Sequence, residues 1–195
     1  TRCDTPAPGP EDAHSNPTRW GAREHYCTWR CLRCDSTGVV VSLALSETGM
    51  QGTLPPTLFG TLAALTNVNM SGNGLGGDLP EGVWALPRLE TLDLSGNRLG
   101  GSLSAAGKRT PPANASRLRT VVLEENRIGG RLPVELLQLP QLQTLNLRGN
   151  QIGSKLPRAA FGASALRELS LDSNALTGGL PTQLATLPSL ELLSA

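Results

Sequence analysis

The chain carries a pattern that recurs with a period of 24 residues over most of its length. Clear copies of L-x-x-L-x-L-x-x-N-x-L-x-G-x-L-P are LETLDLSGNRLGGSL from Leu89, LQTLNLRGNQIGSKLP from Leu142 and LRELSLDSNALTGGLP from Leu166. A fixed period in the twenties with this leucine spacing predicts a solenoid, in which each coil buries its leucines against the next. Such a fold offers a binding face without a built-in active-site cleft, which favours recognition. Variants of the pattern begin at Leu65, Leu89, Leu118, Leu142, Leu166 and Leu190.

The order of residues within one repeat predicts which side chains point into the coil. In LETLDLSGN, we expect Leu89, Leu92 and Leu94 to point inward and the residues between them to face out. The alternation L-x-L has the period of a strand, and stacked strands would form a parallel sheet on the concave side. The repeated Asn is expected to satisfy backbone groups where the chain turns. Glycines that follow it mark a second bend, and Leu-Pro begins the convex return. A column with Phe59, Trp84, Leu137 and Phe161 is a possible spine on that side.

The length of the chain predicts a single domain, and its charge argues against a nucleic-acid partner. The 195 residues carry a net charge of +1, whereas nucleic-acid partners usually require a basic stripe. No apolar run approaches the roughly 18 residues of a membrane helix, so we expect no membrane insertion in this segment. We predict a proline-rich lead-in and cysteine cap over residues 1–38 and about six repeats over residues 39–195, the last incomplete. Because the chain stops at Ala195, inside the strand of a further repeat, we expect the natural chain to continue.

One repeat is longer than the others, since 29 residues separate Leu89 from Leu118. The excess lies in SAAGKRTPPANAS, residues 104–116. Insertions in repeats map to loops, so we predict a loop that projects from the convex or edge surface. A tolerated surface insertion and a partner-contacting loop are both open readings.

Four cysteines precede the repeats: Cys3, Cys27, Cys31 and Cys34. An even number at one end indicates disulfides that close the open end of the solenoid. The alternative is a metal site in which Cys27, Cys31 and Cys34 join Cys3 or His25. The spacing fits neither paired C-x-x-C knuckles nor a familiar zinc finger, so we expect disulfides and no metal.

The repeat unit resembles the plant-type leucine-rich repeat family over about residues 40–195. The resemblance implies an α/β-type repeat solenoid. This would be a right-handed superhelix with a parallel sheet on the concave face and irregular or short 3₁₀ turns on the convex face. Family members are mostly extracellular: receptor-kinase ectodomains, receptor-like proteins, cell-wall enzyme inhibitors, protist surface antigens and a few ice-binding proteins. None of these roles is enzymatic in the repeats.

The cap strengthens the resemblance. Plant-type ectodomains carry C-x-W-x-G-V-x-C before the first strand, and residues 27–34 read C-T-W-R-C-L-R-C. The resemblance implies a Cys27–Cys34 disulfide, with Trp29 packed over the first coil. Cys31 stands at the glycine position, a departure that leaves Cys3 as its natural partner.

Motifs for catalysis and cofactor binding are missing or incidental in the sequence. Residues 72–77, G-N-G-L-G-G, match the dinucleotide-binding G-x-G-x-x-G. However, Asn73 and Gly77 are repeat positions and no amphipathic helix follows them. There is no G-x-S-x-G or H-E-x-x-H motif, and His14 and His25 lie in the lead-in and the cap. We therefore expect no enzymatic activity and no cofactor.

Two N-glycosylation sequons accompany the cysteine cap, Asn69-Met70-Ser71 and Asn114-Ala115-Ser116. Asn114 lies in the predicted projecting loop, which is a good context for an acceptor. Asn69 lies on the predicted concave strand, where a glycan would cover the early repeats.

The outward columns of the concave sheet are the predicted binding face. They mix both signs of charge without an aromatic anchor. Interface hot spots favour Trp, Tyr and Arg, so Arg119, Arg148 and Arg167 are the leading candidates. A merely solvated strand face is the alternative for any one of them. The candidate binding residues are Glu90, Asp93, Arg119, Glu124, Arg148, Arg167 and Asp172.

Together, these features predict a non-enzymatic recognition module, extracellular or at the cell surface. It would bind a protein, peptide or glycan along its concave or lateral face. The second hypothesis is a structural building block of a surface or cell-wall assembly, and the third is an inhibitor of a secreted hydrolase. Ice binding is a distant fourth, because Glu168 interrupts the column of Thr91, Thr120 and Thr144. The ligand and the oligomeric state are not predicted.

Overall fold

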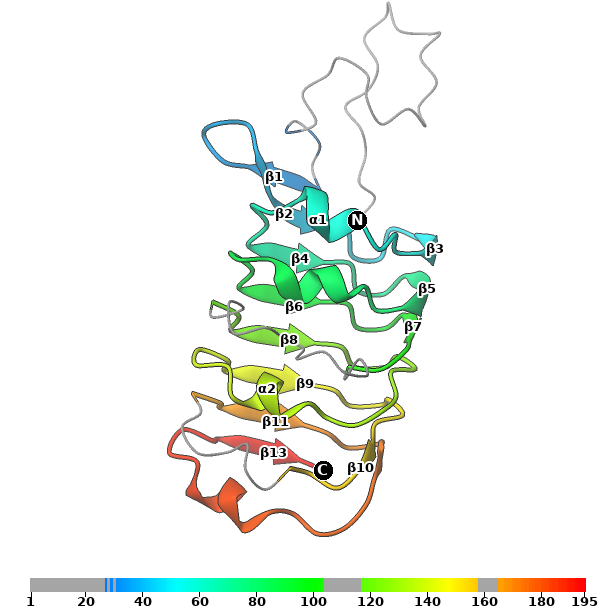
Figure 1. Cartoon of the computed structure of the whole chain (residues 1–195). Helices are drawn as coiled ribbons and strands as arrows, with labels where there is room; N and C mark the ends of the chain where they lie inside the picture. Colours follow the sequence, from blue (N-terminus) through cyan, green and yellow to red (C-terminus); the bar gives the residue numbers. More distant parts are fainter. Residues whose placement is uncertain (1–26, 28, 30, 104–116, 158–164) are drawn as a thin grey trace, which may run out of the picture.

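The chain forms an elongated stack of coils with its N-terminal cap at one end and its last strand at the other (Figure 1). The structure is a computed structural model, and it describes residues 27, 29, 31–103, 117–157 and 165–195. The predicted lead-in and the predicted loop at residues 104–116, with Asn114, lie outside the described residues. The predicted solenoid is confirmed, since every coil returns the chain to the same side of the stack.

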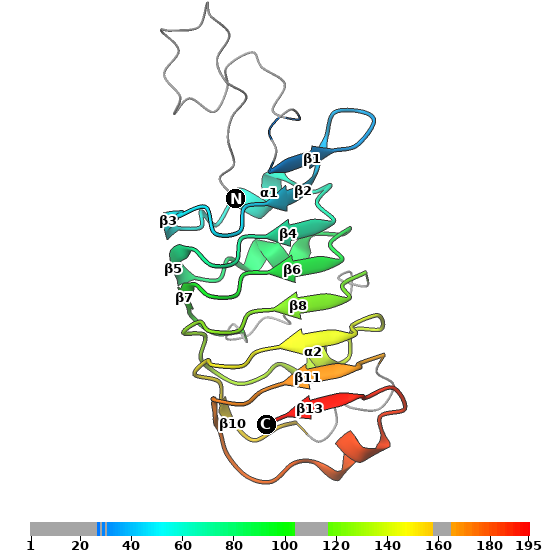
Figure 2. The ribbon, with the colours of Figure 1, turned by 180° about the vertical axis from the view of Figure 1, so that it is seen from behind.

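The concave side is one sheet of eight strands in the order β1-β2-β4-β6-β8-β9-β11-β13 (Figures 1 and 2). From β2 onward all neighbours are parallel, as predicted. The register places Val68 beside Leu92, and Leu92 beside Val121. The strands are β1 (Leu32–Cys34), β2 (Val40–Ala44), β4 (Asn67–Asn69), β6 (Thr91–Asp93), β8 (Thr120–Val122), β9 (Thr144–Asn146), β11 (Glu168–Ser170) and β13 (Leu192–Ser194).

The leucines of the pattern fill the inside of the stack. Leu92 and Leu94 are fully buried, Leu89 nearly so, and the same positions are buried in the repeats on either side. Each leucine packs on its counterparts one coil away, so the core is one continuous column of side chains that runs through the stack. The inward positions predicted from the sequence are confirmed.

The repeated asparagines form a ladder at the turn that follows each concave strand. Asn97 accepts the N–H of Leu75 on Oδ1 at 3.1 Å, and its Nδ2 donates to the carbonyls of Met70 and Leu94 at 3.0 Å each. One amide thus joins two coils in a place closed to water, as the sequence predicts. The same bonds recur at Asn126, Asn150 and Asn174.

The first repeat has Thr48 where the others have asparagine. The Thr48 hydroxyl donates to the carbonyl of Leu45 at 3.0 Å, in place of an amide N–H. The backbone N–H groups of Thr48 and Met50 donate to Oδ1 of Asn73 at 3.1 and 3.0 Å. The ladder therefore starts at Asn73, which also serves the degenerate repeat before it.

A second, narrower sheet runs along one side of the stack, beyond the asparagine ladder. The strands β3 (Gln51–Thr53), β5 (Gly74–Asp78) and β7 (Arg98–Gly100) pair in one part, and β10 (Gly153–Ser154) and β12 (Ala175–Leu176) in another. A bridge between Ser102 and Gly129 lies between the two parts. The sequence predicts only a bend here. We call this surface the lateral face: residues 49–53, 74–78, 98–102, 127–131, 151–155 and 175–179 (Figure 1).

Short helical turns lie on the convex side. They are α1 (Leu58–Thr61), η2 (Glu81–Ala85), α2 (Val134–Leu137) and η4 (Thr182–Thr186), so single α-helical turns occur beside the expected 3₁₀ turns. Phe59, Trp84 and Leu137 are buried, which agrees with a spine along this side. Phe161 lies outside the described residues.

The N-terminal cap ends in a hairpin in which β1 pairs antiparallel with β2. A disulfide joins Cys27 to Cys34, as the resemblance implies. Cys31 is also disulfide-bonded, while its expected partner Cys3 lies outside the described residues, so that pairing stays a prediction. At the opposite end, Leu180, Leu192 and Leu193 are 56%, 51% and 36% exposed.

Candidate binding face

The concave strands present their outward side chains in aligned columns. Thr91, Thr120 and Thr144 stand in one column, which continues to Glu168. The next column runs from Asp93 through Val122 to Asn146 and Ser170. A third column, just after the strands, holds the candidates Glu124, Arg148 and Asp172.

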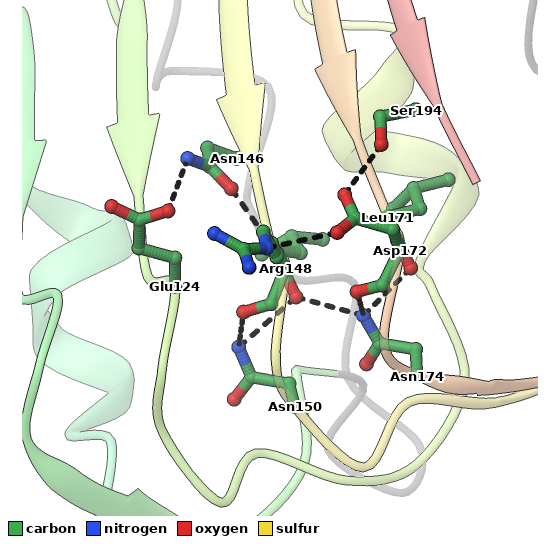
Figure 3. Close-up of polar contacts among 9 residues, drawn as sticks. Glu124, Asn146, Arg148, Asn150, Leu171, Asp172, Asn174 and Ser194 are labelled. Carbon is green, nitrogen blue, oxygen red and sulfur yellow. Dashed lines mark hydrogen bonds and ion pairs between the residues drawn. The ribbon is translucent and has the colours of Figure 1, made fainter.

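Four neighbouring repeats share one polar network around Arg148 (Figure 3). Nε of Arg148 lies 2.9 Å from Oδ2 of Asp172, one repeat further on. Oδ1 of the same carboxylate accepts the hydroxyl of Ser194 at 2.6 Å. On the other side, Nδ2 of Asn146 donates to Oε2 of Glu124 at 2.8 Å, while Oδ1 of Asn146 accepts the backbone N–H of Arg148 at 3.1 Å. The sequence-based candidates Glu124, Arg148 and Asp172 are thus brought together.

This network lowers the pKa of its carboxylate. The hydrogen bond from Ser194 holds the pKa of Asp172 below its ordinary value, with smaller contributions from the nearby Arg148 guanidinium. Desolvation opposes the change. Asp172 therefore stays ionised well into the acidic range and keeps its pairing with Arg148.

The other candidates are less connected. Arg167 lies 3.5 Å from Oε1 of Glu191, and both side chains are largely exposed, so the pair adds little stability. Glu90 and Arg119 sit on adjacent strands, where the N–H of Arg119 donates to the carbonyl of Glu90 at 2.9 Å. Neither side chain makes an ion pair within the part of the chain that the structure describes.

Asp93 and the sequon residue Asn69 adopt the same local turn. Oδ1 of Asp93 accepts the N–H and the hydroxyl of Ser95 at 3.0 and 2.6 Å. Oδ1 of Asn69 accepts the same two groups of Ser71 at 3.0 and 2.8 Å. Asn69 is half-buried on the concave sheet, between buried Val68 and Met70, as predicted.

Three residues of this face are not among the sequence-based candidates: Asn146, Glu191 and Ser194. Glu191 and Ser194 belong to the last strand and complete the contacts of Arg167 and Asp172. The period already places them, because each lies 24 residues after Arg167 or Ser170 in the aligned columns. A polar residue type at one position does not show which neighbouring side chain it will contact. The structure identifies these contacts.

The concave face carries an excess of negative charge. Its cations are Arg33, Arg119, Arg148 and Arg167, of which Arg148 and Arg167 are paired with carboxylates. Electrostatic complementarity steers partners and selects among them, so this face suits a ligand that brings basic groups. The carboxylates of the face are Glu47, Glu90, Asp93, Glu124, Glu125, Glu168, Asp172 and Glu191.

Within the described residues, no group of three or more His, Cys, Asp or Glu side chains could hold a metal ion. Over the same residues, no helix has the length and apolar character needed to cross a membrane.

The comparisons with known proteins agree with this geometry. The family model Leucine Rich Repeat matches residues 64–86, 88–108, 141–162 and 165–187. The Receptor-like protein kinase BRI1-like 3 of Arabidopsis thaliana is 27% identical over 169 residues, which cover 74% of this chain and 14% of that relative. The chain thus spans only a small part of the relative's length.

Solved structures of receptor ectodomains are similar over most of the chain. Pollen Receptor Kinase 3 has a TM-score of 0.72 and 27% identity, covering 86% of this chain and 78% of that one. The ectodomain of the Arabidopsis receptor kinase HAESA, solved with an IDA peptide hormone, has a TM-score of 0.76 and 29% identity, covering 86% and 28%. From its repeats, its stacked parallel sheet and these matches, the chain belongs to the leucine-rich repeat family, with repeats of the plant type.

Proposed function

We propose that this chain is a non-enzymatic recognition module that binds a protein or peptide along its concave face. The observation that carries the proposal is the shared polar network around Arg148, which sets charged and hydrogen-bonding groups in register across four repeats. The fold supplies many aligned strands and a long surface. The peptide hormone bound to the similar HAESA ectodomain supports a peptide-sized ligand.

The charges of the concave face narrow the chemistry of the partner. Carboxylates outnumber arginines there, and Arg148 and Arg167 already contact acidic neighbours. A basic or amphoteric peptide can pair with Glu90, Asp93 and Glu124 while its own carboxylate engages Arg119. Such charged contacts contribute more to specificity and association rate than to affinity.

The test uses peptides selected from a random phage-displayed library on the immobilised chain. Their affinities are then measured for the double variant R119A/R148A and for E90Q/D93N. We expect both variants to weaken binding by about tenfold or more, because each removes charged groups that face the ligand. Lateral-face variants R98Q/R127Q are the matched control. If the selected peptides bind R119A/R148A with unchanged affinity and the variant remains folded, the concave-face assignment is wrong.

We further propose that the chain is extracellular or at the cell surface. The Cys27–Cys34 disulfide supports an oxidising compartment. We also propose that residues 1–38 form the N-terminal cap and that residues 39–195 form the repeats. Non-reducing peptide mapping on native protein should find Cys27–Cys34 and Cys3–Cys31 bonds, with glycan on Asn114 or Asn69. Four free thiols and unmodified asparagines would indicate an intracellular scaffold instead.

A further inference from the structure

The lateral face carries a group of cations that lies apart from the concave face. Arg98, Arg127, Arg131 and Lys155 are all exposed there. Asp78 is the single acidic residue among the described residues of this face. On the concave face carboxylates outnumber cations, so the two faces have opposite charge: acidic on the concave face and basic on the lateral face.

These cations are spaced by the strands of the lateral sheet. The N–H of Arg127 donates to the carbonyl of Leu99 at 2.8 Å, which places Arg98 and Arg127 on neighbouring backbones. Gly153 donates to the carbonyl of Gly130 at 2.7 Å, and Arg131 and Lys155 directly follow the turn positions of the same two coils. Neighbouring strands are about 4.8 Å apart, so the four cations lie on three successive coils at that interval along the axis of the stack.

The surface between the two pairs of cations has almost no side chains. Gly100, Gly129 and Gly153 occupy its centre, and the space above each is bounded only by backbone carbonyl oxygens at 3.7–3.9 Å. A flat ligand can therefore lie on the peptide groups with cations on both sides. The Lys155 side chain extends to the next coil, since its Cγ, Cδ and Cε are 3.3–3.6 Å from where a Cβ at Gly178 would stand.

None of the four cations is neutralised within the described ranges. The ion pairs there are Arg148–Asp172 and Arg167–Glu191, both on the concave side. Like charges on adjacent strands repel, so an anion bound between them removes an unfavourable interaction. The lateral face is thus arranged to accept several negative charges in a row.

We propose that the lateral face binds a linear acidic polysaccharide with a carboxylate on each sugar, lying along the axis of the stack. The recurrence of cations at the strand interval favours a polymer whose anions also recur at short, regular steps. The flat glycine surface favours sugar rings. Single-stranded nucleic acid fits poorly, because its binding sites stack bases on exposed aromatic side chains. The described lateral-face residues include no aromatic residue.

The experiment measures binding of fluorescently labelled oligogalacturonates of increasing length by anisotropy, with neutral dextran oligomers as a blank. Affinity should rise with length until the oligomer spans the repeats from Arg98 to Lys155, roughly 10 Å, and then level off. The variant R98Q/R127Q/R131Q/K155Q should lose at least tenfold in affinity. Its salt dependence should also become shallower, because fewer counterions are exchanged.

The matched control R119Q/R148Q/R167Q removes three of the cations of the concave face. It should keep oligogalacturonate binding while it weakens the selected peptides, and the lateral variant should do the reverse. Failure of this proposal is thereby distinguished from failure of the concave-face proposal. Thermal melting followed by circular dichroism checks that each variant is folded. If the quadruple variant R98Q/R127Q/R131Q/K155Q is unfolded, the double variant R98Q/R127Q takes its place.

Three outcomes would overturn the proposal. The first is no binding of oligogalacturonate by the unmodified chain at low salt. The second is equal loss of affinity in the lateral and concave variants, which would indicate attraction to net charge alone. The third is tighter binding of oligothymidylate or sulfated dextran than of oligogalacturonate at matched charge, which would assign the face to another polyanion.

Discussion

The side-chain nitrogen of Asn126 donates to the carbonyl oxygen of Leu94 at 2.9 Å, across 32 residues of sequence. The equivalent bonds of Asn97, Asn150 and Asn174 span 27 residues. The insertion at residues 104–116 lengthens one coil, yet the asparagine ladder crosses it unchanged. Leu103, just before the insertion, and Leu118, just after it, are both buried. The stacked part of the repeat therefore keeps its spacing.

Replacing Asn126 with Ala should lower the free energy of unfolding by about 2–4 kcal/mol. The change leaves the buried N–H of Leu99 and the carbonyl of Leu94 without their partner, and such unsatisfied groups cost about 1–3 kcal/mol each. Urea denaturation measures the loss. N174A is the control and should cost less, because Asn174 is only half-buried. Equal costs at both sites would mean that the ladder does not stabilise through burial.

Replacing Ser154 with Gly should stabilise the chain by about 0.5–1 kcal/mol. Ser154 has a φ of +81°, at the position where Gly130 has +78° and Gly178 has +83°. An L-residue with a side chain pays to adopt this left-handed conformation, and glycine does not. Thermal unfolding measures the gain.

The reverse change, G130S, is the control for Ser154. A Cβ at Gly130 would clash with the side chain of Ser102, so G130S should destabilise by more than S154G stabilises. If S154G lowers the melting temperature, the strain at Ser154 is offset by contacts of its hydroxyl.

Removing the Ser194 hydroxyl should raise the pKa of Asp172. The hydrogen bond from Ser194 lowers that pKa most, followed by Arg148 among the neighbouring side chains. A carboxyl whose folded pKa is depressed stabilises the fold above its unfolded value of about 3.9, and this contribution is lost as pH falls through the folded pKa. S194A should therefore be less stable than the unmodified chain above about pH 4, and this difference should shrink as the pH falls further.

NMR titration of the side-chain carboxyl carbons tests this directly. The pKa of Asp35, which its hydrogen bonds with Thr37 and Val39 lower, is an internal control and should not change in S194A. R148Q should raise the pKa of Asp172 by less than S194A does. A larger effect of R148Q would show that the ion pair dominates over the hydroxyl.

Loss of the Cys27–Cys34 disulfide should destabilise the cap by about 2–3 kcal/mol, from the entropy of the loop it closes. In a stack where each repeat contacts only its neighbours, the effect should stay near β1 and β2. Hydrogen exchange of C27S/C34S should show faster exchange in β1 and β2, with β9 and β11 unchanged. Uniformly faster exchange over all strands would contradict this local behaviour.

Much of this fold follows from short-range patterns in the sequence. The alternation of Leu92 and Leu94 with polar neighbours determines which side chains are buried, because a strand turns successive residues to opposite faces. The period of the asparagines predicts the ladder, since each amide serves the same backbone groups one coil away. The charged residues of the concave columns could also be named in advance, because their places in the repeat are known.

Contacts between coils could not be predicted in the same way. Repeat position places Arg148 and Asp172 in one column, but rotamers and neighbouring groups decide that Asp172 turns to both Arg148 and Ser194. The second sheet was also missed, because G-G and G-S pairs in the sequence indicate bends. Its strands form only when the coils stack and the backbone of each coil hydrogen-bonds to the backbone of the next coil.

The sequence by itself determined the repeat, the buried leucines, the ladder positions and the cysteine cap, because these depend on a residue's type and its place in a 24-residue unit. The tertiary structure alone decided the second sheet, and with it the basic lateral face. Concave carboxylates and the lateral cations such as Arg98 and Arg127 alternate along the chain, and their charges nearly cancel in the composition. Only stacking separates them, because it aligns the same position of every coil on one side of the molecule.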